Sequence, residues 1–286
     1  MKLQRLTPML MLVCACLHPV RVAREPRPEE PTLNVVTWNV NYGLAGSPDA
    51  LQAMDDATRD ADLVLLQEAN AAWEAQLKAR ISKRFPYQHW LDDQAAGGQA
   101  VLSRRPFIVR EVIDAPSGWF PALRIEAETR IGTVQVLSVH LHPPISDDGS
   151  VVRGYLGTGP TRRRELETFT AALVKGLPTI IVGDFNEGTS GDAIGWATRQ
   201  KFRSALPEFQ PKADTWHWPV TKSLELRAQF DHVLYSPGLE PLNAAVLPIG
   251  RSDHFPVMVK LIAIFEYTPR PTPYGTSLGL TSRGSR

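Results

Sequence analysis

The segment from Pro178 to Asn186 most constrains this chain, because a short β-branched run ends there abruptly in a carboxylate and an amide. This pattern is typical of a buried strand that delivers polar groups to the edge of a sheet. Asp184 and Asn186 are two positions apart, so extended backbone would place both side chains on one side. Such a pair can hold a water molecule beside a phosphate. An Asx turn that closes the strand is the alternative interpretation.

Length and composition are compatible with one large α/β domain. The chain has 286 residues, of which 43% are hydrophobic, enough for a full core. Sheet-rich folds often exceed about 200 residues without dividing. The formal charge is +1, and it becomes −1 when Lys2 and Arg5 of the first 15 residues are removed. The chain therefore carries no excess of basic residues that would grip nucleic acid by charge alone.

The first 16 residues have the layout of a secretory leader. Lys2 and Arg5 precede an apolar stretch, and a small residue precedes Cys16. The stretch is too short for an ordinary membrane span. Its end also resembles a bacterial lipobox, in which the cysteine becomes the lipidated first residue. We expect export, with residence in the cell envelope as a lipoprotein or secretion.

Composition divides the rest of the chain into three parts. Residues 17–31 are rich in Pro, Arg and Glu and are predicted to form a linker. Residues 32–265 carry the strand and helix patterns and form the predicted domain. Residues 266–286 contain Pro, Thr, Gly and Ser throughout and are predicted to be a disordered tail. Both cysteines lie in the leader, so the domain needs a core that stands without a disulfide.

Two further strands are predicted to end in polar side chains. The alternating segment 33–41 ends with the amides of Asn39 and Asn41, and the apolar segment 62–68 ends with Glu68. A helix is predicted after each strand. The first begins near Ser47, and the second is expected to bury one face, formed by Trp73, Leu77 and Ile81.

The middle of the chain predicts antiparallel strands around 97–106, 108–113, 123–128 and 131–142. The last of these places His140 near its end, where a structural histidine is the alternative to a catalytic one. A Gly- and Pro-rich loop follows at 143–161, a length typical of binding segments. Arg162, Arg163 and Arg164 then open a helix that ends at Gly176. Their side chains are predicted either to form a solvated helix face or to attract an anionic substrate.

The last third of the chain adds more candidate residues. Residues 190–206 predict an irregular helix, and residues 215–219 predict an aromatic loop that contains Trp216. A strand at 229–235 carries Asp231, and Ser252-Asp253-His254 introduces a last strand that runs through residue 265.

Taken in order, these motifs resemble those of the endonuclease/exonuclease/phosphatase superfamily. The matching segments are Trp38-Asn39, Gln67-Glu68, Ser138 to Leu141, Gly183 to Asn186, Asp231 and Ser252 to His254. The resemblance implies an α/β fold, a four-layer sandwich in which two packed, mostly antiparallel (mixed) β-sheets are flanked by helices. It also implies an active site at the edge where the strand ends converge.

The resemblance implies a role for each matching residue. Asn39, Glu68 and Asp253 would serve the metal, and His140, Asp184, Asn186, Asp231 and His254 would be catalytic. Asn41, Arg162 and Trp216 are further candidates for substrate binding. Oxygen ligands suit Mg²⁺ or Mn²⁺ rather than zinc. A carboxylate that pairs with His254 would favour the imidazolium, which can donate to a phosphoryl oxygen.

The sequence thus predicts a metal-dependent phosphoester hydrolase that acts as a monomer on a phosphodiester. Nucleic acid is the first substrate class, because no hydrophobic membrane hairpin is evident in the sequence. A sphingomyelinase- or phosphoinositide-type phospholipid hydrolase is the alternative enzyme. A catalytically silent binding domain of the same fold is the alternative outside enzymes. Whichever of these functions applies, a lipidated Cys16 would attach the protein to a membrane.

Overall fold

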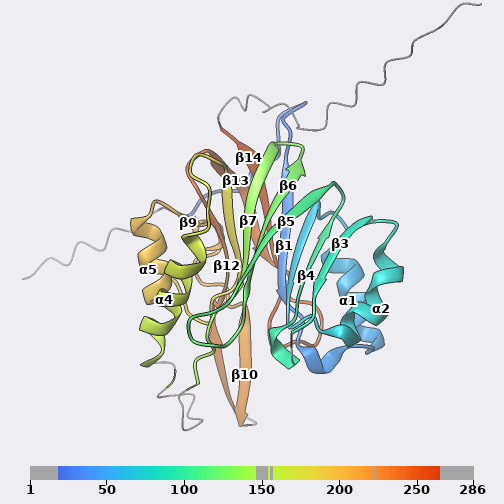
Figure 1. Ribbon diagram of the computed structural model, residues 1–286, viewed down its shortest axis with the longest axis vertical. Helices are drawn as coiled ribbons and strands as arrows, with labels where there is room; N and C mark the ends of the chain where they lie inside the picture. The colour runs from blue at the N-terminus through green and yellow to red at the C-terminus, as the bar shows by residue number, and fades with distance from the viewer. Residues whose placement is uncertain (1–18, 94, 146–153, 155–156, 222, 265–286) are drawn as a thin grey trace, which may run out of the picture.

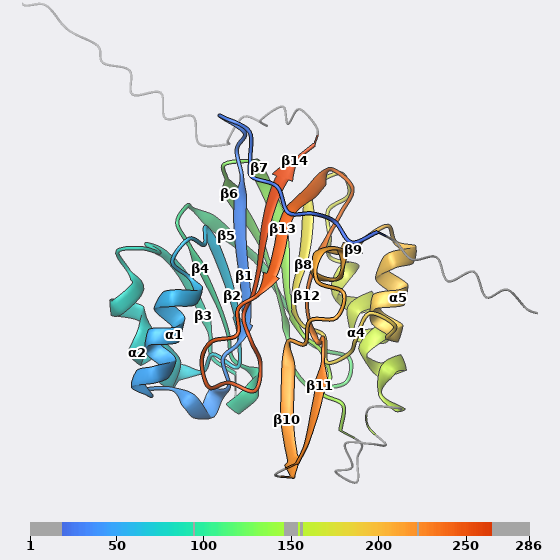
Figure 2. The same cartoon turned by 180° about the vertical axis from the view of Figure 1, so that it is seen from behind.

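The computed structural model describes residues 19–93, 95–145, 154, 157–221 and 223–264 (Figures 1 and 2). The described residues form two six-stranded sheets and a separate two-stranded hairpin. Every described strand and helix lies between Leu33 and Ala263. No described helix combines the length and the hydropathy needed to cross a membrane.

The first sheet has the spatial order β13-β14-β1-β2-β4-β3. All its neighbours pair antiparallel except β1 and β2, which are parallel. In chain order its strands are β1 (Leu33–Asn39), β2 (Leu63–Gln67), β3 (Tyr87–Leu91), β4 (Gln99–Ser103), β13 (Leu239–Val246) and β14 (Val257–Ala263).

The second sheet has the order β5-β6-β7-β8-β12-β9 and also contains one parallel pair, β7 with β8. In chain order its strands are β5 (Phe107–Ile113), β6 (Ala122–Thr129), β7 (Gly132–His140), β8 (Thr179–Asp184), β9 (Arg203–Ser204) and β12 (Asp231–Tyr235). Both sheets are therefore mixed and mostly antiparallel, as predicted.

Helices cover the outer faces of the two sheets (Figure 1). On the side of the first sheet lie α1 (Pro48–Ala57) and α2 (Ala71–Ile81), and on the side of the second lie α4 (Gly159–Thr170) and α5 (Asp192–Arg199). Shorter helices are η1 (Tyr42–Leu44), η2 (Ala95–Gly97) and α6 (Leu206–Phe209). Trp73, Leu77 and Ile81 are the buried residues of α2, as their spacing predicts.

Three buried clusters correspond to the three interfaces between these layers. The first joins the inner faces of the sheets, with Val35, Leu65, Ile125 and Val182 among its members. The other two pack α1 and α2 on one sheet and α4 and α5 on the other. The four-layer α/β sandwich predicted above is confirmed.

The topology brings chemically active strand ends to one edge. Because β1 is parallel to β2, and β7 to β8, the carboxyl ends of each pair lie together. Strand β12 runs antiparallel to β8 and begins at that edge, with Asp231 directly opposite Asp184. Residues from five strands thus meet in one place, although they are far apart in the sequence.

Part of the predicted linker packs on the domain. The backbone N–H groups of Arg21 and Arg24 donate to the carbonyls of Glu208 and Leu242, and Arg21 also forms ion pairs with Glu208 and Glu240. Composition predicts a linker at residues 17–31, and these bonds show that its described part contacts the domain. The leader and the tail lie outside the described residues.

The aromatic loop predicted at 215–219 is instead part of a β-hairpin. Strands β10 (Trp216–Thr221) and β11 (Leu224–Ala228) pair antiparallel, and they project from the body of the molecule (Figure 2). Pro219 in the middle of a run argues against a strand, but among the described strands β10 pairs only with β11, so its other edge can accommodate a proline. Two smaller predictions are also corrected. The helix predicted to reach Gly176 ends at Thr170, and the segment 190–206, predicted to be one irregular helix, contains α5, β9 and the start of α6.

Candidate active site

A cavity of about 300 Å³ opens at the edge where the strands end. Its polar lining comes from predicted site residues, and its remaining walls are mainly aromatic and proline side chains. The lining residues are Asn39, Glu68, Ala96, Trp119, Phe120, His140, Pro143, Pro144, Ile145, Asp184, Asn186, Trp216, Trp218, Phe230, Asp253 and His254. One charged, polar floor is therefore surrounded by apolar walls.

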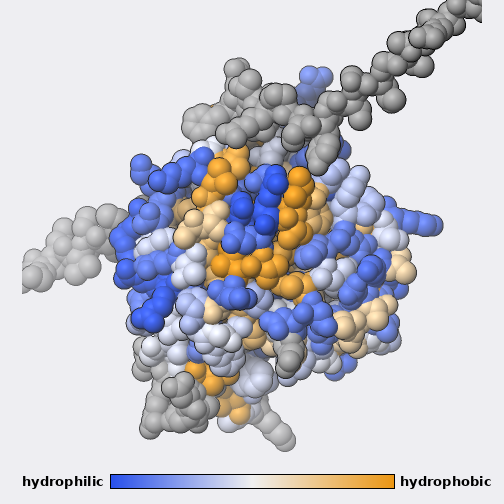
Figure 3. All heavy atoms as spheres, viewed as in Figure 1, coloured by the Kyte–Doolittle hydropathy of each residue, from blue (hydrophilic) through white to orange (hydrophobic). Residues whose placement is uncertain are grey.

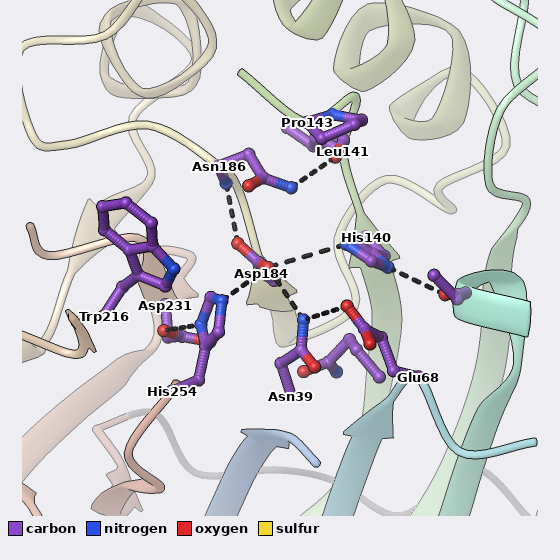
Figure 4. A network of polar contacts seen from close by, with 12 residues as sticks. Asn39, Glu68, His140, Leu141, Pro143, Asp184, Asn186, Trp216, Asp231 and His254 are labelled. Atoms are coloured by element: carbon purple, nitrogen blue, oxygen red, sulfur yellow. Dashed lines mark hydrogen bonds and ion pairs between the residues drawn. The ribbon is translucent and has the colours of Figure 1, made fainter. Parts of the chain in front are cut away.

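Asp184 lies at the centre of the polar network (Figure 4). One carboxylate oxygen accepts from the backbone N–H of Asn186 at 2.8 Å, and the other accepts from Asn39 Nδ2 at 3.1 Å. The Nε2 atoms of His140 and His254 lie 3.6 and 3.5 Å from that second oxygen. Burial raises the pKa of Asp184, while the charge of His254 opposes that rise. A buried carboxylate with a raised pKa is suited to accept a proton.

Glu68 lies beside Asp184 and is joined to it through one amide. Asn39 Nδ2 donates to Glu68 at 3.0 Å as well as to Asp184, and the backbone N–H of Tyr42 donates to the other Glu68 oxygen at 3.1 Å. Burial raises the pKa of Glu68, and these two hydrogen bonds oppose the rise. Glu68 thus has only neutral hydrogen-bond donors among the described residues.

The backbone is unusual at the residues that follow two of these strands. Glu68 and Asn186 have φ angles of 58° and 52°, a region that residues other than glycine adopt at a cost. Gly183 has a φ of 144°, and a Cβ atom there would collide with the carbonyl of Val139 on β7. The turns that aim Glu68 and Asn186 into the cavity are therefore held by the surrounding fold.

Asp231 and His254 form the predicted pair. His254 Nδ1 lies 2.8 Å from Asp231 Oδ2, and both side chains are buried. Burial disfavours the imidazolium, but the charges of Asp231 and Asp184 outweigh that effect and raise the pKa of His254 to about 10. His254 is therefore charged at neutral pH, with Nε2 directed toward Asp184 and the cavity (Figure 4).

His140 is the electrostatic opposite of His254. Burial lowers its pKa to about 4, and the charge of Asp184 only partly offsets this effect. Its ring stacks on Phe120 at 4.1 Å, and Nδ1 lies 3.3 Å from the carbonyl of Ala96. At neutral pH, donation from Nδ1 to that carbonyl leaves Nε2 as an acceptor that faces the cavity.

Asn186 and Asp253 reach the cavity but already have partners. Asn186 Nδ2 donates to the carbonyl of Leu141 at 2.8 Å, which leaves one amide N–H for other contacts. Asp253 accepts from Asn41 Nδ2 at 3.1 Å and from Trp216 Nε1 at 3.2 Å. Asn41 and Trp216 therefore both contact Asp253, and Trp216 also lines the cavity.

Arg162 lies outside the cavity lining and not on a solvated helix face. Only 2% of the residue is exposed, and its guanidinium pairs with buried Glu187 at 3.0 Å. It also donates to Thr158 Oγ1 and to the carbonyl of His142. The prediction of a solvated face is therefore wrong for Arg162, whose charge ties α4 to the segment that follows Asn186, but it holds for the exposed Arg163 and Arg164. Attraction of an anionic substrate stays a prediction.

Sequence reasoning missed the aromatic residues Trp119 and Phe120, which line the cavity. They follow Ser117-Gly118 in a turn, where isolated aromatic residues give no periodic signal. It also missed Thr215, whose Oγ1 accepts from the backbone N–H groups of Phe230 and Asp231. A Thr beside an aromatic run is common in sequences, so this pattern does not mark Thr215 as a site residue.

The donor set fits a divalent cation. Glu68, Asp184 and Asp253 line the cavity, and within the described ranges none of them forms an ion pair with Lys or Arg. Ligand atoms of Asp184, Asp231 and His254 lie within 4.8 Å of one another. That group is a poorer site than the carboxylates of Glu68 and Asp253, because Asp231 and His254 are already bonded to each other and the imidazole is charged. Carboxylate and amide oxygens are the ligands that Mg²⁺ and Mn²⁺ prefer.

Comparison with protein-family models matches residues 36–254 to the endonuclease/exonuclease/phosphatase family. This span runs from β1 to His254 and so contains every residue of the network in Figure 4. No curated protein sequence matches the chain significantly.

Solved structures with the same fold include an endonuclease/exonuclease/phosphatase from Beutenbergia cavernae DSM 12333 (18% identity, TM-score 0.60, covering 82% of this chain and 72% of that one). D. rerio TDP2 complexed with single strand DNA product is similar at 19% identity and a TM-score of 0.61, covering 80% and 98%. The 3′ phosphatase NExo from Neisseria, bound to a product DNA hairpin, is similar at 17% identity and a TM-score of 0.58, covering 79% and 98%. At these identities the likeness shows the fold alone.

Proposed function

Because the chain belongs to the endonuclease/exonuclease/phosphatase family, we propose that it hydrolyses phosphodiesters with a divalent cation and an activated water molecule. The observation that carries the proposal is the charge of the cavity. Carboxylates converge there, and among the described residues no Lys or Arg pairs with them. Such a site repels a phosphate unless a cation is bound, and a catalytically silent binding domain has no use for that arrangement.

Glu68 and Asp253 are the residues that we propose would hold the cation. Asn39 would support Glu68, because its Nδ2 donates to that carboxylate while its Oδ1 already accepts from the backbone N–H of Asn41. A bound Mg²⁺ or Mn²⁺ would neutralise charge on the phosphoryl oxygens. Glu68 is held for this task by Asn39 Nδ2 and the backbone of Tyr42. Burial raises the pKa of Glu68, so cation binding is expected to weaken as pH falls and the carboxylate gains a proton.

Asp184 is the proposed general base. Its carboxylate is held at both oxygens, so it can receive a proton from water without reorienting. His140 places a neutral acceptor 3.6 Å away and helps to fix that water. Positioned proton acceptors of this kind are typically worth ~10²- to 10⁴-fold in rate.

His254 is the proposed donor to the phosphoryl oxygen. Nδ1 is committed to Asp231, so the proton on Nε2 is the one available to the cavity. A charged donor in a buried site stabilises the negative charge that develops on phosphorus. The second N–H of the Asn186 amide can add a neutral hydrogen bond to the same group.

Nucleic acid is one candidate substrate. The support comes from the D. rerio TDP2 and Neisseria NExo structures, which contain DNA products. Aromatic walls such as Trp119, Trp216 and Phe230 could stack on bases. The near-zero formal charge of the chain favours a short or single-stranded segment over duplex, since duplex binding rests on phosphate contacts by basic residues.

A phospholipid headgroup is the second candidate, and the β10–β11 hairpin favours it. The sequence-based preference for nucleic acid depended on the lack of an evident hydrophobic hairpin. That premise is wrong, because Trp218, Val220, Leu224 and Leu226 are exposed on this hairpin.

A substrate panel tests the proposed function. Purified protein would be assayed with Mg²⁺, Mn²⁺ and Ca²⁺ against single-stranded DNA, plasmid DNA, RNA, sphingomyelin vesicles and bis-p-nitrophenyl phosphate. We expect hydrolysis of bis-p-nitrophenyl phosphate and of one natural class. The proposal fails if no phosphodiester in the panel is cleaved with any of the three metals by a protein that melts cooperatively.

Export and lipidation at Cys16 remain a proposal that rests on the leader, which lies outside the described residues. One acyl chain binds a membrane only marginally and several chains anchor stably. A Cys16→Ser variant is therefore expected to bind the membrane fraction more weakly, and an intact leader on the mature wild-type protein by mass spectrometry would refute lipidation. We also retain the proposal that the protein acts as a monomer.

A further inference from the structure

The β10–β11 hairpin has two chemically different faces. Trp218 pairs directly with Leu226, and alternation along β11 places Leu224 on the same face. Val220 lies in the bulge between Pro219 and Thr221. We call these four residues the apolar hairpin face; their exposed fractions are 51% for Trp218, 50% for Val220, 52% for Leu224 and 40% for Leu226. The other face carries the paired residues His217 with Arg227 and Pro219 with Glu225.

No other described strand pairs with this hairpin, which forms a two-stranded sheet of its own. Two-stranded hairpins alone are marginally stable in water, and the four apolar side chains of this one are left 40–52% exposed to solvent. Apolar surface also appears at the lower end of the molecule in Figure 3, where β10 projects in Figure 1. The apolar hairpin face is therefore suited to burial against a partner.

The apolar hairpin face is continuous with the wall of the active-site cavity. Trp218 belongs to both, and Trp216, one step closer to the body on the same face, lines the cavity. Trp119 and Ile145 also line the cavity and are exposed to 44% and 38%. Apolar side chains from separate segments thus surround the mouth of the cavity.

The base of the hairpin is fixed to the catalytic segment. The backbone N–H of His217 donates to the carbonyl of Asp253 at 2.9 Å, and that of Phe255 donates to the carbonyl of Thr215 at 2.7 Å. The ring of His217 stacks on that of Phe255 at 4.5 Å. A surface that binds the apolar hairpin face is therefore held in a defined position relative to His254.

We infer that the apolar hairpin face docks on a lipid surface and presents a phospholipid headgroup to the cavity. A lipid surface accepts exposed Trp and Leu side chains without a shaped partner, and Trp is favoured at membrane interfaces. On the opposite face, Glu225 and Arg227 form an ion pair with an N–O distance of 2.5 Å, so their charges neutralise each other. A nucleic acid would instead call for unpaired basic residues along its path.

The consequence for substrate class rests on the proposed phosphodiesterase function, but docking itself does not. The test uses the chain from Pro19 onward, which contains every described helix and strand and omits the predicted apolar leader. Sedimentation with zwitterionic phosphatidylcholine vesicles measures partition without attraction to anionic lipid. The test variant is Leu224→Ser with Leu226→Ser, and neither residue lines the cavity. The matched control is Glu225→Gln with Arg227→Gln, on the opposite face of the same strand.

We expect wild type to sediment with the vesicles, the leucine double variant to partition about tenfold more weakly or worse, and the control to stay within about twofold of wild type. Val220→Ser should weaken partition in the same direction. Melting temperatures verify that each variant is folded.

Equal partition of the leucine variant, or no partition by wild type, would overturn the inference. A leucine variant that loses binding to a single-stranded oligonucleotide, in a protein that does not bind vesicles, would also overturn it and would assign the hairpin to nucleic acid. Vesicle binding without hydrolysis of any phosphodiester in the substrate panel would leave docking intact and refute the proposed function.

Discussion

Replacing Asp184 by Asn is expected to reduce kcat/KM by about 10³-fold or more, because the amide cannot take a proton from water. The loss should appear in kcat rather than in KM, since the carboxylate acts on the attacking water and not on the bound substrate. Initial rates with bis-p-nitrophenyl phosphate at saturating Mg²⁺ measure both constants.

The matched control for this variant is Asp253→Asn. Both carboxylates accept from neutral donors at each oxygen, so an amide at either position places an N–H against a donor. Asp253 is a proposed cation ligand, so added Mg²⁺ should restore the activity of Asp253→Asn, whereas Asp184→Asn should stay impaired at saturating Mg²⁺. An Asp184→Asn variant that is folded and within tenfold of wild type would exclude Asp184 as the base.

The second large effect is expected at the Asp231–His254 pair. His254→Ala and Asp231→Asn should each reduce kcat/KM by ~10²- to 10⁴-fold. Because Asp231 acts through His254, the double variant should be little worse than His254→Ala alone. A double-mutant cycle on kcat/KM measures this, and additive losses would mean that the two residues act independently.

The pH–rate profile of Asp231→Asn separates a catalytic role of Asp231 from a purely structural one, because a structural role would not change the profile. In wild type the pKa of His254 is raised to about 10, so the imidazolium persists through neutral pH and is lost only as pH approaches that value. Without the charge of Asp231 that pKa falls, and the alkaline limb of the rate profile should move toward neutrality. An unchanged alkaline limb would contradict the assignment.

The same pair contributes to stability with a defined sign. The folded pKa of His254 lies above its ordinary value of 6.5, so its contribution is fully present below pH 6.5 and disappears as pH rises through about 10. The melting temperatures of wild type and Asp231→Asn should therefore converge as the pH is raised toward 10.

Local patterns predicted much of the fold. Trp73, Leu77 and Ile81 identify the buried face of α2, and the apolar runs that end at Gln67 and Asp184 identify β2 and β8. These succeed because burial of a periodic face is decided within one segment. The arrangement of the sheets came from the order of the motifs, through the family resemblance, and not from any single segment.

Features that depend on distant partners could not be predicted. Arg162 is the first of three consecutive arginines, a pattern that predicts a solvated helix face. It is nevertheless buried, because it pairs with Glu187, which lies 25 positions away in the sequence. The predicted linker packs because Glu208 and Glu240 are in reach of Arg21. Burial of a charge is set by tertiary structure, which composition does not contain.

The candidate site shows the same division. Asp184, Asp231 and His254 were predicted to meet, and they do so through the β8–β12 register and the segment before β14. The hairpin was missed because a proline interrupts β10 and because apolar residues in a short run without a buried face look like a loop. The apolar and polar faces of the hairpin can be assigned only once the pairing of Trp218 with Leu226 is known.

The most direct test of the central claim is the metal dependence of phosphodiester hydrolysis, measured for wild type and Glu68→Gln side by side. We predict no turnover of bis-p-nitrophenyl phosphate in excess chelator and recovery when Mg²⁺ or Mn²⁺ is added back. Glu68→Gln keeps the shape of the side chain but removes an anionic ligand, so it should need a higher metal concentration for half-maximal rate and reach a lower maximum. Full turnover by wild type in excess chelator would contradict a metal-dependent mechanism.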